Sequence, residues 1–539
     1  MRQTVQDRSW LAALLALSLL CFVPGFFSLP IVDRDEARFV QTSAQMLDSG
    51  DLVDLRLGDD ARYNKPVGIY WMQAGMAALI GAPEAVQSYR AVSLVGALGA
   101  VFMTYLIGRL VLARPTAFAA AALMGATLVL GAEARIGKTD AMLLFLILLP
   151  QYVLLRGALD DGRAGRIGPG GIAAFWGGMA LAVLVKGPIV FLVVLPLLAF
   201  LCLRARSLAP LWRLRPGPGL VVFLALVLPW YVAITLRSGG EFWQASLMRD
   251  FLGKLHEEQE SHGAPFGTYT LLFWVTFWPG SMVFAAALPT IWRARRALWV
   301  QLAAAWVLPM WFAFEIASTK LPHYTMPAYP ALAITAVWAL ERARQDERMP
   351  RAALWVSAAV GGVGILVLGA FLFSAQHLRS EVGVYFWLGA LGVVVAVPLV
   401  WLMLSRQAWH GLGLAALATS LAMATALYPS LARMERVWPS VALADQARAH
   451  PDCTLWVAGY REASLLFLTR REVSFDSAAD IAERIGQGGC ILAAITGDEL
   501  PEFTALQPDL VAYDELDLFN FGNGRDIRFH LFLSPAEGG

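Results

Sequence analysis

The sequence is poor in charged residues: only 15% of its 539 residues are Asp, Glu, Lys or Arg, against about a quarter in ordinary globular proteins. Its apolar share of 58% excludes a multidomain soluble enzyme, because so much apolar surface needs lipid as its solvent. An excess of one charge sign is also lacking, since the net charge is +1, so nothing points to a nucleic-acid partner. The composition predicts a polytopic α-helical membrane protein.

Cysteine is scarce as well. The four cysteines are too few for a disulfide scaffold, and Cys21 and Cys202 lie inside apolar runs. Cys453 and Cys490 therefore remain as the only candidate pair, and each stands just before a short β-rich run. A disulfide between them and two unpaired buried cysteines are both compatible with the sequence.

About thirteen apolar stretches are long enough for membrane-spanning helices. The end of the first stretch, Phe27-Ser28-Leu29-Pro30, lacks the small residues of a signal-peptide cleavage site, so we expect a retained anchor. The stretches lie near residues 10–29, 87–112, 115–131, 141–156, 172–185, 188–203, 217–236, 270–291, 297–316, 325–341, 353–374, 384–404 and 411–429.

The basic residues fall on alternate loops, and cytoplasmic loops retain Lys and Arg. We therefore assign the loops with these residues, and the N-terminus, to the cytoplasm. The outer face then receives residues 30–86, 237–269, 317–324 and 375–383 together with the C-terminus. The basic set is Arg2, Arg8, Arg109, Arg114, Arg156, Arg163, Arg166, Arg204, Arg206, Arg213, Arg215, Arg293, Arg295, Arg296, Arg342, Arg344, Arg348 and Arg351.

After about residue 430 the composition turns polar, and short β-rich runs alternate with helical stretches such as 477–486. This pattern predicts a small α/β domain on the outer side. We therefore divide the chain into a transmembrane domain, residues 1–429, and an external domain, residues 430–539. The β-rich runs are residues 454–458, 473–475, 490–495 and 527–533.

The first outer loop holds the densest charge run near any membrane segment, residues 31–38. Apolar residues at helical spacing follow it, and Gly50 is a suitable terminator, so we expect an amphipathic helix lying along the membrane interface. A second apolar stretch, residues 68–80, is too short to span comfortably and is entered through residues 62–66. We expect it to lie flat or half inserted.

Several ionisable residues near the outer span ends are candidates for a site. Asp35 could equally cap a helix, and Asp140 could be a helix N-terminal carboxylate stabilised by the dipole. Lys186 and Lys320 stand at outer span boundaries, where a snorkelling or solvated lysine is the commoner explanation. Glu315 is the main exception to this placement, because it lies within its span toward the outer end.

The joint placement of these residues favours a site. With the predicted topology, Asp35, Lys65, Asp140, Lys186 and His262 converge with Lys320 on one membrane face. Carboxylates together with several cationic groups at the lipid boundary can hold phosphate oxygens and position a reacting group. A transporter would place ionisable groups near the mid-depth of discontinuous helices. The sequence therefore favours an enzyme at the outer leaflet, and a lipid-linked-sugar flippase or transporter is the alternative of another class.

Six ordered motifs over about residues 30–330 resemble those of the bacterial lipid A aminoarabinose transferases, which are relatives of the protein O-mannosyltransferases among the GT-C glycosyltransferases. The external domain fits the same pattern more weakly. The motifs are Asp33-Arg-Asp35-Glu36-Ala-Arg38, Arg62-Tyr63-Asn64-Lys65-Pro66 with Tyr70-Trp71, Arg135-Ile-Gly-Lys138-Thr-Asp140, Leu184-Val-Lys186-Gly-Pro188, Glu260-Ser-His262-Gly-Ala-Pro265 and Thr319-Lys320-Leu-Pro322-His323-Tyr324.

The resemblance implies inverting transfer of a sugar, aminoarabinose above all, from undecaprenyl phosphate to lipid A or a related lipopolysaccharide acceptor. The reaction would take place at the periplasmic face of the bacterial inner membrane, among membrane lipids, with the chain as a monomer. By motif match, Asp35 and Asp140 are the catalytic acidic residues. The residues implied in binding donor phosphate or substrate are Glu36, Arg38, Tyr63, Lys65, Arg135, Lys138, Lys186, Lys320, His323 and Tyr324.

Asn64 departs from the family pattern, because many aminoarabinose transferases have Glu immediately before the lysine. That Glu is associated with a divalent metal in the family, so a metal at Glu260 and His262, and the identity of the sugar, stay open. The alternative within the enzyme class is transfer of a hexose, uronic acid or mannose to a glycan or protein hydroxyl. A phosphate acceptor needs no base, whereas a hydroxyl acceptor would require Asp35 to take a proton.

Overall fold

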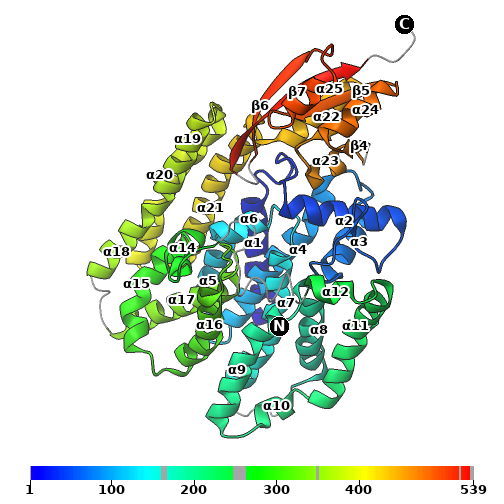
Figure 1. The fold of residues 1–539 in the computed structure, drawn as a ribbon. Coiled ribbons are helices and arrows are strands. Elements are labelled where there is room, and N and C mark those ends of the chain that lie inside the picture. The colour runs from blue at the N-terminus through cyan, green and yellow to red at the C-terminus, as the bar shows by residue number, and fades with distance from the viewer. Residues whose placement is uncertain are drawn as a thin grey trace.

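The computed structural model describes residues 2–159, 167–246, 263–346, 351–470, 472–520 and 524–534. Helices make up most of the molecule, and a five-stranded sheet with its own helices lies at one end, near the C-terminus (Figure 1). Helices dominate because lipid offers no hydrogen-bond partner to the backbone, so each segment must satisfy its own amides and carbonyls. The predicted polytopic helical architecture is confirmed.

A helix or a helix pair coincides with each predicted apolar stretch. Among the described residues, eight helices are long and apolar enough to cross a membrane when α18 and α19 count as one, or nine if α14 and α15, bent by 118°, form one span. The count of thirteen spans therefore stays a prediction. The helices are α1 (Arg2–Phe22), α4 (Val86–Gly108), α5 (Arg114–Ala126), α7 (Asp140–Leu159), α8 (Pro169–Lys186), α9 (Ile189–Ala205), α11 (Pro216–Arg237), α14 (Thr268–Thr276), α15 (Gly280–Arg293), α16 (Leu298–Ile316), α17 (Tyr329–Asp346), α18 (Arg351–Gly361), α19 (Val363–His377), α20 (Gly383–Ser405) and α21 (Trp409–Ala432).

The first outer loop folds into two helices, α2 (Asp35–Ser49) and α3 (Gly68–Ile80), as the sequence predicts. Gly50 ends α2 in the left-handed conformation, at φ 70°, and its N–H donates to the carbonyl of Met46. Between the helices a two-stranded hairpin, β1 (Arg56–Leu57) and β2 (Asp60–Ala61), was not predicted, because two residues per strand leave no alternation to read.

The C-terminal segment forms a mixed sheet in the order β4-β3-β5-β7-β6. Strands β3 (Thr454–Ala458), β4 (Val473–Phe475) and β5 (Ile491–Thr496) are parallel, and β7 (Arg525–Ser534) runs antiparallel to β5 and to β6 (Asp514–Asn520). Four strands and α24 (Ala478–Gly486) match the predicted runs, whereas the edge strand β6 is rich in acidic residues and gave no apolar signal. The other helices are α22 (Pro439–Ala449), α23 (Ala463–Leu468) and α25 (Leu500–Leu506).

Cys453 and Cys490 form a disulfide. They stand before β3 and β5, which are parallel neighbours, so the two cysteines meet at the same end of the sheet. This decides between the two alternatives that the sequence leaves open.

The C-terminal segment packs on the first outer loop, and Figure 1 shows α23 directly above α2. A buried apolar cluster joins the two parts, which we call the docking cluster. Helix α2 is thereby held between the transmembrane body and the C-terminal sheet. The docking cluster consists of Ile31, Ala37, Val40, Ala77, Val86, Tyr89, Ala463 and Phe467.

Candidate active site

Two helix ends meet at the centre of the site. Asp140 is the first residue of α7 and Lys186 is the last of α8, and the Lys186 Nζ donates to Asp140 Oδ1 at 2.5 Å. Gly96 of α4 allows the first turn of α7 to approach, because a Cβ there would lie 2.5 Å from the backbone nitrogen of Met142. Asp140 is thus both a helix N-terminal carboxylate, as the simpler explanation held, and the partner of a lysine from another helix.

A histidine extends this pair into a buried chain of polar groups. His323 lies in the turn after α16, with its Nε2 3.5 Å from Asp140 Oδ1 and its Nδ1 3.4 Å from Glu133 Oε1. Glu133 ends α6 (Leu128–Glu133) and pairs with Lys138 at 3.1 Å. We call Glu133, Lys138, Asp140, Lys186 and His323 the buried cluster. The sequence assigned Glu133 no role, although it stands five residues before Lys138.

The protonation of the buried cluster follows from its surroundings. Burial raises the pKa of Glu133 to about 7 and lowers the pKa of His323 to about 3. Burial also disfavours the charged form of Lys138, but the carboxylates of Glu133, Asp140 and Asp35 outweigh it and raise its pKa. His323 is therefore neutral at neutral pH, whereas Lys138 keeps its charge.

Asp35 lies beside the buried cluster. Its side chain is exposed, yet the loss of hydration caused by the surrounding protein is the largest single influence on its pKa. Burial and the negative charge of Asp140 raise the pKa of Asp35. The larger combined effect of Lys138, His323 and Lys186 lowers this pKa below its ordinary value. The N-cap position of α2 is Arg34, and no side chain caps the helix, so the structure does not support Asp35 as a helix cap.

The segment with Lys65 approaches Lys186 through close helix packing. Gly68, the first residue of α3, lies against α8 so closely that a Cβ there would be 2.7 Å from the carbonyl carbon of Leu184. Lys65 precedes Gly68 by three residues and Lys186 follows Leu184 by two. Lys186 also lies over the ring of Tyr324, with its Nζ 5.3 Å from the ring centroid.

Two predicted binding residues are instead enclosed by protein contacts. Glu36 is fully buried, and its two oxygens accept from Arg90 Nε and Nη2, each at 2.7 Å. Arg135 is also buried and donates to the carbonyls of Cys21, Pro24 and Gly131. These contacts join the first outer loop and the α6–α7 turn to the helices around them, and the binding roles implied for the two residues stay predictions.

Tyr63 and Lys320, also implied in binding donor phosphate or substrate, make hydrogen bonds within the protein. The Tyr63 hydroxyl donates to Asp54 at 2.7 Å, and burial followed by this hydrogen bond raises the pKa of Tyr63 to about 12. The buried Lys320 donates to the carbonyl of Ala317 at 2.5 Å and closes its own turn. Arg38 is half-buried and lies near Glu462 of the C-terminal segment. Burial raises the pKa of Glu462, and the charge of Arg38 offsets part of this rise.

Glu315, the exception within its span, caps a helix. Its oxygens accept from the backbone N–H groups of Gly267 and Thr270 at 2.9 and 3.0 Å, at the beginning of α14. Glu260 and His262, predicted for a metal, lie outside the described residues. Within the described part of the chain, no group of three or more His, Cys, Asp or Glu side chains is arranged to hold a metal.

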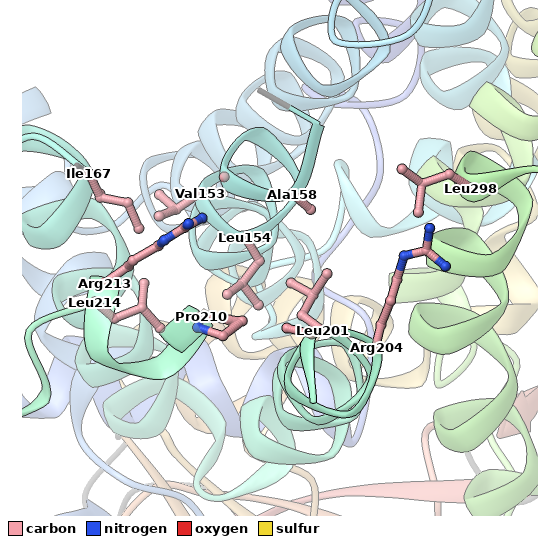
Figure 2. Close-up of a pocket in the computed structure, with 12 residues that line it drawn as sticks. Val153, Leu154, Ala158, Ile167, Leu201, Arg204, Pro210, Arg213, Leu214 and Leu298 are labelled. Carbon is pink, nitrogen blue, oxygen red and sulfur yellow. The ribbon is translucent and has the colours of Figure 1, made fainter. Parts of the chain in front are cut away.

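A cavity of about 290 Å³ lies away from the buried cluster, among α7, α9, α16 and α10 (Ala209–Arg213). Apolar side chains line it, together with Arg204 and Arg213 from separate helices (Figure 2). Figure 1 shows α10 at the end of the molecule opposite the C-terminal sheet. The cavity is therefore no part of the site formed by Asp35 and the buried cluster.

The chain is similar to known proteins in sequence and in fold. Residues 64–232 match the family described as dolichyl-phosphate-mannose-protein mannosyltransferase. The undecaprenyl phosphate-alpha-4-amino-4-deoxy-L-arabinose arabinosyl transferase of Pseudomonas aeruginosa strain UCBPP-PA14 is 30% identical over 378 residues, which are 69% of this chain and 65% of that relative. The namesake from Aeromonas hydrophila is 26% identical, over 67% of this chain and 66% of the relative.

The fold extends the likeness to the whole chain. The crystal structure of ArnT from Cupriavidus metallidurans bound to undecaprenyl phosphate matches with a TM-score of 0.77 at 20% identity, covering 98% of both chains. The archaeal oligosaccharyltransferase AglB from Archaeoglobus fulgidus matches with a TM-score of 0.50 at 12% identity, covering 91% of this chain and 70% of that one. The chain therefore shares the fold of these two solved transferases, and it is similar in sequence to the bacterial aminoarabinose transferases, as its six motifs predict.

Proposed function

We propose that this protein transfers a sugar, aminoarabinose or a close analogue, from undecaprenyl phosphate to lipid A or a related lipopolysaccharide acceptor, with inversion at the anomeric carbon. The observation that carries the proposal is the buried cluster beside the carboxylate of Asp35. Two acidic groups and two ammonium groups meet where the ends of α6 and α8 approach the beginning of α7. The relatives similar in sequence are named for transfer from the same lipid phosphate.

The donor phosphate is assigned to Lys65 and Lys186. Close packing of α3 on α8 brings their segments together, and two ammonium groups neutralise the phosphate as the glycosidic bond breaks. The lipid tail is assigned to the outward face of α3, where Leu79 and Ile80 are 80% and 51% exposed. Exposed apolar residues on a helix too short to span suit a position at the lipid boundary.

The chemistry needs little from the protein beyond charge and position. The acceptor oxygen attacks the anomeric carbon from the face opposite the donor phosphate, the bond from that carbon to the phosphate oxygen breaks, and undecaprenyl phosphate leaves. A phosphate acceptor is already nucleophilic, so Asp35 orients the acceptor or stabilises positive charge on the sugar ring. The ammonium groups of Lys138 and Lys186 keep Asp35 ionised for this role. Asp140 holds the ammonium of Lys186 in place.

The membrane orientation is part of the proposal. The arginine-rich loops are assigned to the cytoplasm and the C-terminal sheet to the periplasm. The disulfide between Cys453 and Cys490 supports this assignment, because disulfides persist in oxidising compartments such as the bacterial periplasm.

Asn64 favours a second candidate function, transfer of another sugar to a glycan or protein hydroxyl. It replaces the Glu found before the lysine in many aminoarabinose transferases, and residues 64–232 match a mannosyltransferase family. In that reaction Asp35 would also take the proton of the acceptor hydroxyl, a role worth roughly 10²- to 10⁴-fold in rate.

Mass spectrometry of lipid A and core glycans tests the proposal. Cells that carry the protein should contain lipid A with the added mass of one or two pentosamine groups, and cells without it should lack that species. Complementation with the Asp140→Asn variant is the matched control and should not restore it. Identical lipid A in both strains, with a sugar missing from another glycan or protein, would favour the second candidate instead.

A further inference from the structure

Asp33, another carboxylate of the motif that contains Asp35, has no part in the proposed chemistry. Asp33 lies two residues before Asp35, and its oxygens accept hydrogen bonds from Ser464 Oγ, from the Tyr460 hydroxyl at 3.0 Å and from Ser440 Oγ at 3.4 Å. The three hydroxyls come from α22, from the turn after β3 and from α23, and all three side chains are buried. Three separate elements of the C-terminal domain therefore converge on one carboxylate of the first outer loop.

The hydroxyls also bind one another. Ser440 Oγ lies 2.7 Å from both the Tyr460 hydroxyl and Ser464 Oγ. Each hydroxyl has one proton, so when Tyr460 and Ser464 donate to Asp33, the Ser440 hydroxyl donates to one of its three neighbours and can accept no proton from the other two hydroxyls. Asp33 is therefore held by the donors Tyr460 and Ser464, and Ser440 lies against both of them.

The residue between the two carboxylates has a strained backbone. Arg34 is at φ 63° and ψ −103°, where a residue with a Cβ is rare, and it is the N-cap of α2. Its N–H points to Glu462 Oε2 of the C-terminal domain at 3.4 Å. Strained backbone persists when its surroundings over-determine it, and here contacts with the C-terminal domain stand at Asp33 and Arg34.

The first turn of α2 is hydrogen-bonded directly to the residues around this strained position. The amide of Ala37 donates to the carbonyl of Val32, and the amide of Arg38 donates to that of Arg34. Ala37 also belongs to the docking cluster, together with Ala463 and Phe467 of α23. The direction in which Asp35 projects from this turn therefore depends on contacts made more than 400 residues away in the sequence.

We propose that Asp33 is a positioning residue: through Ser440, Tyr460 and Ser464 the C-terminal domain fixes the strained start of α2 and so aims Asp35 at the reacting sugar. The domain is then a structural part of the active site as well as an external appendage. The inference rests on the proposed function for its rate measurement alone, since the order of the first turn of α2 can be measured without any substrate.

Transfer kinetics of the purified full-length protein test the proposal. Asp33→Ala should lower kcat for transfer by roughly 10- to 100-fold and leave the KM for the donor within about two-fold, because misplacement by about 1 Å can cost a factor of this size. Asp33→Asn should retain most of the activity, since an amide still accepts from and donates to hydroxyls, whereas Asp35→Asn should lose it. The matched control is Asp60→Ala, which breaks the exposed contact of Asp60 with Arg461 between the same two parts and should leave kcat unchanged.

Hydrogen exchange of the same proteins supplies the readout that does not depend on activity. In Asp33→Ala the amides of Ala37 and Arg38 should exchange faster than in the wild type, while those in the middle of α2 should not change. The double variant Tyr460→Phe/Ser464→Ala, which leaves Asp33 in place, should show the same exchange and the same loss of kcat. If Asp33→Ala does not fold, the double variant tests the proposal in its place.

Wild-type kcat in the Asp33→Ala variant, or in the double variant, would overturn the proposal, and so would unchanged exchange at both amides. Loss of activity in Asp33→Asn with unchanged exchange would also overturn it, because the carboxylate would then act in the chemistry itself. If the wild-type protein transfers no sugar at all, the proposed function fails, and the exchange measurement still decides whether Asp33 orders α2.

Discussion

Asp35 and Glu36 are neighbours in the sequence, and their amide variants should fail in opposite ways. Glu36 accepts four hydrogen bonds in the interior, two from Arg90 at 2.7 Å, one from the N–H of Gly137 at 2.7 Å and one from the N–H of Val32 at 2.9 Å. Glu36→Gln places an NH₂ group against these donors and leaves the fully buried guanidinium without a counter-charge. Breaking a buried pair in this way costs roughly 3–5 kcal/mol.

A loss of this size is a large part of the roughly 5–15 kcal/mol that stabilises a typical protein. Asp35→Asn should change the free energy of unfolding by about 1 kcal/mol or less, because the Asp35 side chain is exposed and caps no helix. Reversible denaturation of the two purified variants in detergent micelles measures the difference, and a transfer assay on the folded fraction accompanies it. Glu36→Gln should be unstable, and Asp35→Asn should be stable and inactive.

The opposite pattern would refute this division of roles. A Glu36→Gln protein as stable as the wild type but unable to bind donor would return Glu36 to the substrate-binding role that its motif implies. An Asp35→Asn protein that unfolds readily would mean that Asp35 serves the helix rather than the reaction.

Three further changes test the packing, the charges and the topology. Gly68→Ala should weaken donor binding, because its Cβ would lie 2.7 Å from the carbonyl carbon of Leu184 and push α3 away from α8. The control is Gly75→Ala on the same helix, whose Cβ meets no atom within 4 Å. Equal donor affinities of the two variants would contradict the packing argument. Because burial raises the pKa of Glu133 to about 7, from 4.5, its contribution to stability is full below about pH 4.5 and is lost as the pH rises through about 7. This loss should be absent from unfolding curves of Glu133→Gln, and parallel pH dependences in the two proteins would disprove it. A cysteine at exposed Asp60 should react with a membrane-impermeant maleimide from the periplasmic side, and labelling only from the cytoplasmic side would reverse the topology.

Local signals in the sequence predict much of the first outer loop. The terminator at Gly50 and the helical spacing before it predict α2, and the apolar length of residues 68–80 matches α3. Motif order and the alternation of basic loops also predict that Asp35, Asp140 and Lys186 lie on one face of the membrane. The predictions of α2 and α3 are confirmed, because capping, spacing and span length are properties of neighbouring residues, and the shared membrane face stays a prediction.

Local sequence signals do not predict which side chains far apart in the sequence will pair. Arg90 meets Glu36 from 54 residues away, and Ser464 meets Asp33 from 431 residues away. The same limit explains Glu315, which is the exception to the placement of ionisable residues at span ends and whose oxygens cap α14. Pairings of this kind are set by how the helices pack, so a charged residue in a motif can serve the fold as readily as the reaction.

The most direct test of the account is sugar transfer by the purified protein from undecaprenyl-phosphate-linked aminoarabinose to lipid A. The wild type should form glycosylated lipid A together with free undecaprenyl phosphate, and folded Asp35→Asn and Asp140→Asn should form neither. Product formation by both folded variants would contradict the account, and so would transfer from a nucleotide sugar at an equal rate without the lipid.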